Sequence, residues 1–152
     1  MILLDSDHLS ALRYRSGARA NRLAARLASA AELPIGTTIA NVEEAMRGWM
    51  ASIAKERLIR RQIAAYRELA DLFGFFSGYH IALFDEAAAD RYDALKSTRV
   101  RIGTMDLKTA AIALAHGALL LTANRRDFEK VPGLRFENWM DAASARDAPP
   151  VQ

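Results

Sequence analysis

Residues 1–10 of this 152-residue chain read Met-Ile-Leu-Leu-Asp-Ser-Asp-His-Leu-Ser. The apolar run of Ile2, Leu3 and Leu4 predicts a short, fully buried strand of the kind found in parallel sheets. Asp5 follows this run directly, so we expect its carboxylate at the carboxyl end of the strand. In open α/β sheets, ligands and chemistry are located at this edge. Asp5 is therefore the first candidate active-site residue.

The rest of the chain alternates between short apolar or β-branched runs and helical patterns. We predict further strands at 35–39, 80–84, 118–122 and 134–136, and helices at 8–12, 21–30, from Thr38 or Asn41 onward, 55–73, 86–96, 107–116 and 124–128. Ser6 or Asp7 is expected to cap the first helix, and residues 74–78 to interrupt the longest one. This alternation favours an α/β fold, with a parallel sheet covered by helices on both faces. The two helices before the third strand are expected to form a hairpin that stands off the sheet.

Composition narrows the class of protein. The chain is 51% hydrophobic and has no linker or internal repeat, so we expect a single domain over 1–140 and a frayed tail over 141–152. The absence of cysteine excludes disulfides, thiolate metal sites and cysteine nucleophiles. After Met1, only three apolar residues precede Asp5, too few for a signal peptide, and no run reaches the roughly 18 apolar residues of a membrane span. We therefore expect a soluble, cytoplasmic protein that does not contact a membrane.

Acidic and amide side chains lie at several points that the predicted sheet would bring to one edge. Glu44 lies about one turn into the helix after the second strand, Asp106 opens the helix before the fourth, and Asn124 and Asp127 follow the fourth. Carboxylates crowded beside Asp5 repel one another and cannot all stay ionised unless a cation neutralises them. Oxygen ligands without cysteine or clustered histidine are typical of Mg²⁺ or Mn²⁺ sites. Because such a cation activates water and polarises a phosphoryl group, we expect hydrolysis of a phosphodiester.

Four segments, in this order, resemble motifs of the PIN-domain family, specifically the VapC-type toxin ribonucleases of prokaryotic toxin–antitoxin pairs. They read Leu-Leu-Asp-Ser-Asp-His-Leu-Ser at 3–10, Val-Glu-Glu-Ala-Met-Arg-Gly at 42–48, Ile-Gly-Thr-Met-Asp-Leu at 102–107 and Leu-Thr-Ala-Asn-Arg-Arg-Asp-Phe at 121–128. The resemblance extends from residue 3 to about residue 139. It implies a PIN-like three-layer α/β/α fold with a short parallel sheet of four to five strands and a protruding helical hairpin.

The resemblance also implies a metal-dependent endoribonuclease in which Asp5, Glu44 and Asp106 hold Mg²⁺ or Mn²⁺ and position the attacking water. Glu44 is preferred to its neighbour Glu43 because the family's acid lies four residues before a glycine, here Gly48. Relatives of this kind act on RNA, commonly form homodimers and are silenced by an antitoxin that occupies the active-site groove. These three partners are therefore expected for this chain.

The fourth site position is left open between two residues. Asn124 stands where many relatives have Asp, so either its amide oxygen or the carboxylate of Asp127 is expected to support the site. Ser6 and Thr122 are expected to form hydrogen bonds to the site. Asp7 is interpreted as a helix cap rather than a ligand.

The roles of two further groups remain open. Loop arginines near the predicted edge fit contacts with RNA phosphates, although a solvated surface is an equally ordinary interpretation; they are Arg99, Arg101, Arg125 and Arg126. The apolar stripe of the helix over 55–73, from Ile59 to Phe73, is expected to be core or a dimer interface.

Two other functions compete with the nuclease interpretation. An aspartyl-phosphate phosphatase opens with a similar Asp-x-Asp after a strand, as at Asp5 and Asp7, but Leu9 stands where that family has threonine. The other competitor is a PIN-like module that binds RNA or protein after losing catalysis, which the amide at Asn124 favours.

Overall fold

Five short strands form one parallel sheet in this computed structural model, which describes residues 1–142. The strands are β1 (Ile2–Leu4), β2 (Ile35–Thr38), β3 (His80–Ala82), β4 (Leu119–Leu121) and β5 (Arg135–Glu137). Their order is β3-β2-β1-β4-β5, and every neighbouring pair is parallel. The predicted α/β class and the five strands are confirmed. The tail predicted over 141–152 lies almost wholly outside the described residues.

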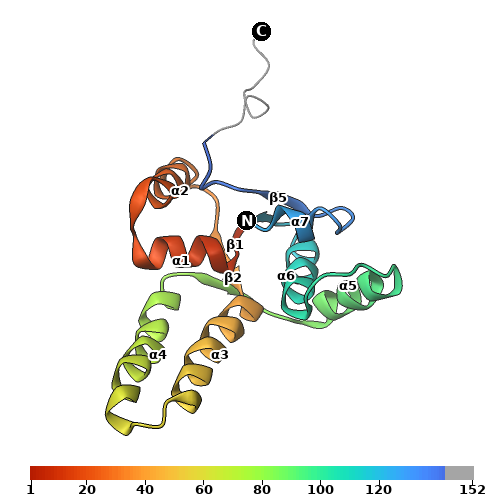
Figure 1. The fold of residues 1–152 in the computed structure, drawn as a ribbon. Coiled ribbons are helices and arrows are strands. Elements are labelled where there is room, and N and C mark those ends of the chain that lie inside the picture. The colour runs from red at the N-terminus through yellow and green to blue at the C-terminus, as the bar shows by residue number, and fades with distance from the viewer. Residues whose placement is uncertain (143–152) are drawn as a thin grey trace.

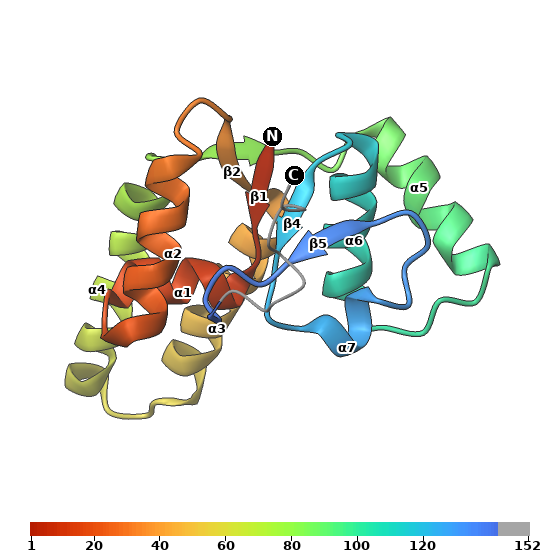
Figure 2. The same ribbon diagram turned by 90° about the horizontal axis from the view of Figure 1, so that it is seen from above.

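Helices cover both faces of this sheet (Figures 1 and 2). They are α1 (Ser6–Tyr14), α2 (Gly17–Ser29), α3 (Ile39–Lys55), the 3₁₀ turn η1 (Ile59–Arg61), α4 (Gln62–Phe76), α5 (Glu86–Ser97), α6 (Thr104–Ala115) and α7 (Arg125–Phe128). The hairpin of α3 and α4 projects from the sheet, as expected (Figure 1). Within residues 1–142, no helix combines the length and the apolar character that crossing a membrane requires.

The central strand β1 explains the three layers. Its side chains alternate between the two faces of the sheet: Ile2 and Leu4 join the apolar cluster under α1, α2 and α4, whereas Leu3 joins the cluster under α5 and α6. All three are buried. A strand covered by helices on both faces of the sheet must carry apolar side chains on both faces. The apolar run of β1 therefore lasts as long as the strand is covered and ends at Asp5, at the edge of the sheet.

The start of α1 differs from the prediction. The helix begins at Ser6, and its N-cap is Asp5, whose carboxylate accepts a hydrogen bond from the Ser6 backbone N–H at 2.9 Å. Asp7 lies in the first turn of the helix and caps nothing there. The prediction of Ser6 or Asp7 as the cap is wrong because Asp5 itself keeps the extended backbone that a cap requires.

The helical hairpin also differs from the prediction in two respects. Helix α4 continues through Gly74 to Phe76, since burial of Leu72 and Phe76 against the sheet offsets the roughly 1 kcal/mol that a glycine costs a helix. The stripe expected to be core is instead exposed, by between 47% and 75% at its large apolar residues, which are Ile59, Ile63, Tyr66 and Phe73. Its alternative role as a dimer interface stays a prediction.

Candidate active site

The register of the sheet aligns the carboxyl ends of its three central strands. Leu4 of β1 pairs with Thr37 of β2 and with Leu121 of β4, so Asp5 lies level with Thr38 on one side and with Thr122 on the other. Two of these residues are in direct contact, because the Thr122 hydroxyl donates to Asp5 Oδ2 at 2.7 Å. The apolar pattern that sets this register therefore also places the candidate site.

Asp5 is a buried carboxylate in a negative environment. Only 7% of the residue is exposed. Burial, and next the negative charge of Asp7, raise the pKa of Asp5 from 3.8 to about 7, while hydrogen bonds from Thr122 and from the Ser6 backbone oppose this shift. The charge of Asp106 adds to the rise. The surroundings of Asp5 therefore favour its protonated form far more than water does.

Asp106 brings a second carboxylate to the same place. It lies in the first turn of α6, which begins at Thr104 after the N-cap Gly103, so it does not open the helix as predicted. Burial raises the pKa of Asp106, followed by the charges of Asp127, Glu44 and Asp7. Carboxylates from α1, α3 and α7 thus act on the one that α6 carries.

The two neighbouring glutamates of α3 point in different directions. Glu44 accepts a hydrogen bond from the Ser6 hydroxyl. Glu43 instead pairs with Arg47 at 3.0 Å and with Lys108 at 3.7 Å. Of the two, Glu44 therefore belongs to the group of acids around Asp106.

Asn124 lies between two carboxylates and contacts both. Its amide nitrogen donates to Asp106 Oδ2 at 3.3 Å and to Asp127 Oδ2 at 3.2 Å, and its backbone N–H donates to the Thr122 hydroxyl at 3.0 Å. Asp127 also binds Lys130 at 2.9 Å, and these two donors, Lys130 first, lower its pKa. An aspartate at position 124 would add a charge here, whereas the amide holds two acids together.

Asp7 and His8 form a contact that sequence reasoning missed. Asp7 binds His8 Nδ1 at 2.5 Å through one oxygen and the backbone N–H of Ala123 at 2.7 Å through the other. The other ring nitrogen, Nε2, accepts from the Trp139 backbone N–H at 3.3 Å. The ring proton is therefore on Nδ1 and is donated to Asp7. This chain of contacts ties the first turn of α1 to the end of β4.

Comparison with known proteins identifies this arrangement. The sequence model of one family, described as PIN domain, matches residues 2–134. The chain belongs to the PIN domain family. It is 32% identical over 83 residues, 52% of this chain, to the tRNA(fMet)-specific endonuclease VapC of Salmonella typhimurium. That match covers 63% of the relative, and the chain spans less than two thirds of the length of the curated relatives it matches.

Solved structures share the fold of this PIN domain. DNA-bound VapBC from Salmonella typhimurium aligns with a TM-score of 0.69 and 22% identity, covering 91% of this chain and 97% of that one. A toxin–antitoxin complex from Klebsiella pneumoniae aligns with a TM-score of 0.61 and 21% identity, covering 88% and 95%. The expected PIN-like fold is confirmed, and the family match favours a nuclease over the aspartyl-phosphate phosphatase.

Asn41 supports the site of this PIN domain through buried hydrogen bonds, a role that the sequence analysis did not predict. Its amide donates to the Leu4 carbonyl at 3.0 Å and accepts from the Thr109 hydroxyl at 3.1 Å. The Thr37 hydroxyl donates to the same Leu4 carbonyl at 2.7 Å. Thr38, one of the two helix starts predicted, caps α3 by accepting from the Asn41 backbone N–H. This buried network fixes the peptide that precedes Asp5.

Replacing Asn41 with alanine is expected to lower the free energy of unfolding by about 1–3 kcal/mol, because it removes the buried hydrogen bonds that the Asn41 amide forms with the Leu4 carbonyl and the Thr109 hydroxyl. Urea unfolding followed by circular dichroism measures this loss. Asn21→Ala is the matched control, since Asn21 lies at an exposed position of α2. Equal losses in the two variants would contradict the structural role of the network.

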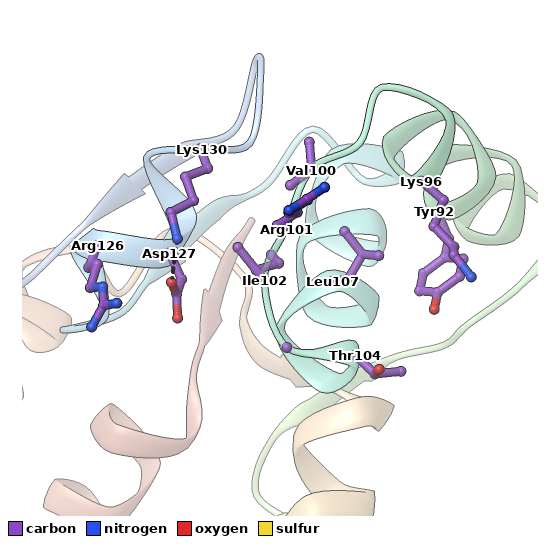
Figure 3. A pocket seen from close by; sticks show the side chains of 11 residues that line it. Tyr92, Lys96, Val100, Arg101, Ile102, Thr104, Leu107, Arg126, Asp127 and Lys130 are labelled. Carbon is purple, nitrogen blue, oxygen red and sulfur yellow. Dashed lines mark hydrogen bonds and ion pairs between the residues drawn. The ribbon is translucent and has the colours of Figure 1, made fainter.

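The four candidate arginines do not act as one group. Arg101 and Arg126 line a cleft of about 610 Å³ beside the acids (Figure 3). Arg125 lines a different, smaller cavity and lies 3.8 Å from Glu129. Arg99, in left-handed backbone conformation after α5, lines neither of these cavities. Two of the four thus share a surface next to the candidate site.

The donor set fits a hard divalent cation by its chemistry, since it consists of carboxylates that repel one another when ionised. Across residues 1–142, however, no three His, Cys, Asp or Glu side chains are gathered at the spacing of a metal site. The acids are instead held by protein donors: Thr122 on Asp5, Ser6 on Glu44 and Asn124 on Asp106.

Proposed function

We propose that this PIN domain is a divalent-cation-dependent endoribonuclease and the toxin of a toxin–antitoxin pair. The observation that supports the proposal is that burial, and next the negative charges of neighbouring acids, raise the pKa values of Asp5 and Asp106 at one sheet edge, with Glu44 among the acids that act on Asp106. Homology to VapC endonucleases supports RNA as the substrate. The relatives named for tRNA(fMet) make transfer RNA the first substrate to test.

Asp5, Glu44 and Asp106 would hold Mg²⁺ or Mn²⁺. A cation bound there polarises the phosphoryl group and increases the acidity of water. Thr122 and the Ser6 backbone orient the Asp5 carboxylate, and Asn124 orients that of Asp106. Asp127 supports the site through Asn124 and stays ionised because Lys130 lowers its pKa. A groove site of this kind suits splayed loop RNA better than a regular duplex.

We further propose an antitoxin and a second copy of the chain as protein partners. The support is the exposed apolar side of the hairpin, which includes Tyr66 and Phe73. It continues into an apolar groove of about 250 Å³ lined by Val42, Met46, Leu72, Phe73, Phe76 and Ile81. Apolar surface of this extent commonly marks a protein interface.

Glu44→Gln is expected to lower kcat/KM for RNA cleavage on the order of 100-fold, because it removes the charge of one of the three acids proposed to hold the cation. The matched control is Glu43→Gln, which changes the adjacent residue by the same atoms but only breaks pairs with Arg47 and Lys108. Cleavage of a radiolabelled transfer RNA, with Mg²⁺ or Mn²⁺ and with EDTA, measures both variants.

The outcomes separate the nuclease from a module that has lost catalysis. Cleavage that requires the cation and falls only in Glu44→Gln supports the proposal. If pure wild-type protein binds RNA but leaves it intact with either cation, the binding module is correct and the nuclease is not. If Glu43→Gln loses activity instead, the choice between the two glutamates is wrong.

A further inference from the structure

The cleft beside the acids is bounded by α5, the loop before α6, and α7 (Figure 3). Its lining is strongly cationic at the rim, with Lys96, Arg101, Arg126 and Lys130. Asp127 is the single acidic side chain in that lining. Four cations facing one carboxylate create a positive potential that concentrates anionic ligands.

Two of these cations form no direct ion pair within residues 1–142, although the charge of one of them, Arg126, helps to lower the pKa of Asp127. Lys130 is bound to Asp127 at 2.9 Å, and Lys96 lies over the Tyr92 ring at 5.7 Å. Arg101 and Arg126 form no ion pair or side-chain hydrogen bond with any residue of the described range 1–142, and both are exposed. Guanidinium groups left free in this way are suited to phosphate oxygens, which they bind through two parallel hydrogen bonds.

The cleft is continuous with the acid cluster. Gly103 lines the cleft and caps the helix that carries Asp106. Asp127 lines the cleft and shares the Asn124 amide with Asp106. A nucleic-acid strand bound at the acids would therefore continue into the cleft on this side.

The cavity on the other side of Thr122 differs in charge. It is lined by Arg26 and Arg125 together with Glu137 and Asp141. Arg26 lies 3.7 Å from Glu137, and Arg125 lies 3.8 Å from Glu129. Because its cations are balanced by acids, this cavity offers a polyanion much less attraction than the cleft.

We propose that the cleft binds the phosphate backbone of the RNA strand on one side of the scissile bond, with Arg101 and Arg126 each contacting one phosphate. The inference rests on the proposed nuclease function and adds a binding subsite to it. Contacts of this kind position the strand and are independent of base sequence. Arg99 and Arg125 lie outside this subsite.

The test is the double variant Arg101→Gln/Arg126→Gln, bound to fluorescent single-stranded RNA in EDTA and followed by anisotropy over a range of salt. Each phosphate contact contributes about 0.7 to the slope of log K against log salt for single strands. Loss of two contacts should make the slope shallower by about 1.4 and weaken binding at low salt roughly tenfold. With the cation present, kcat/KM should fall in parallel through KM.

Arg60→Gln/Arg61→Gln is the matched control, because it removes the same charge at η1, at the far end of the hairpin (Figure 1). An unchanged slope in the cleft variant, or an equal change in the control, overturns the subsite. If wild-type protein cleaves RNA while the cleft variant binds and cleaves normally, the subsite falls and the nuclease stands. If no cation supports cleavage but the slope changes as expected, the nuclease falls and the subsite stands.

Discussion

Asp5→Asn should abolish RNA cleavage, with a loss on the order of 1,000-fold or more, while the protein stays folded. Asparagine has the shape of aspartate, can accept from the Ser6 backbone, and can donate to the Thr122 hydroxyl. It removes the negative charge that the proposed cation requires. Single-turnover cleavage of transfer RNA measures the loss, and circular dichroism checks the fold.

Asp90→Asn, on the exposed side of α5, is the matched control and should cleave RNA at the wild-type rate. Both proteins need the same purification, because trace host ribonuclease would hide the effect. Full activity in pure Asp5→Asn protein would show that RNA cleavage does not depend on the Asp5 carboxylate.

The metal-free protein should lose stability as pH rises, and Asp5 should be the cause. A carboxyl group whose pKa is higher in the folded state holds its proton more tightly there, so its contribution is most favourable below the unfolded pKa of about 4 and falls until pH passes about 7. A rise from 3.8 to about 7, at about 1.4 kcal/mol per pKa unit, sets a limit of about 4 kcal/mol.

Urea unfolding of wild-type and Asp5→Asn protein in EDTA, between about pH 4 and pH 8, isolates this contribution. The variant should be similar to wild type at the acidic end and increasingly more stable as pH rises. Addition of Mg²⁺ at the alkaline end should stabilise wild type and not the variant, since a ligand that binds only the folded state raises its stability. A difference between the two proteins that is independent of pH would show that Asp5 titrates normally.

The sequence predicts this fold well because its signals are local. Each strand is a short apolar or β-branched run, and parallel pairing then fixes which residues meet: Leu4 beside Leu121 puts Asp5 beside Thr122 without any knowledge of the side chains. Glu44 and Asp106 reach the same edge because α3 begins where β2 ends and because α6, which leads into β4, begins at that edge. Their proximity follows from topology alone.

Contacts between side chains were less predictable. Asp7 resembles a helix cap in sequence, but its partners are His8 and the backbone of Ala123, 116 positions away. Asn41 resembles a helix start, yet its amide spans β1 and α6. No local pattern encodes these distances, because they depend on how α1, α3 and α6 pack.

The basic cleft is predictable from the sequence only in part. Arg101 and Arg126 can be selected from the sequence because they lie in or beside predicted loops near the sheet edge. The sequence gives no reason to select Lys96, in the last turn of α5, or Lys130, after α7, since a single lysine at a helix end ordinarily faces water or interacts with the helix dipole. The packing of α5 and α7 against the same helix, α6, brings them to one surface.

The hydrogen bond from the Trp139 backbone to His8 joins residues 131 positions apart. Strand β5, which precedes Trp139, also accepts the Thr122 backbone N–H through the Glu137 carbonyl at 2.9 Å. During synthesis, residues 5–8 leave the ribosome long before these partners exist. A nascent chain therefore carries its acids without the contacts that hold them in place. We expect the site to form only once nearly all of the domain has been translated, which delays activity until the end of synthesis.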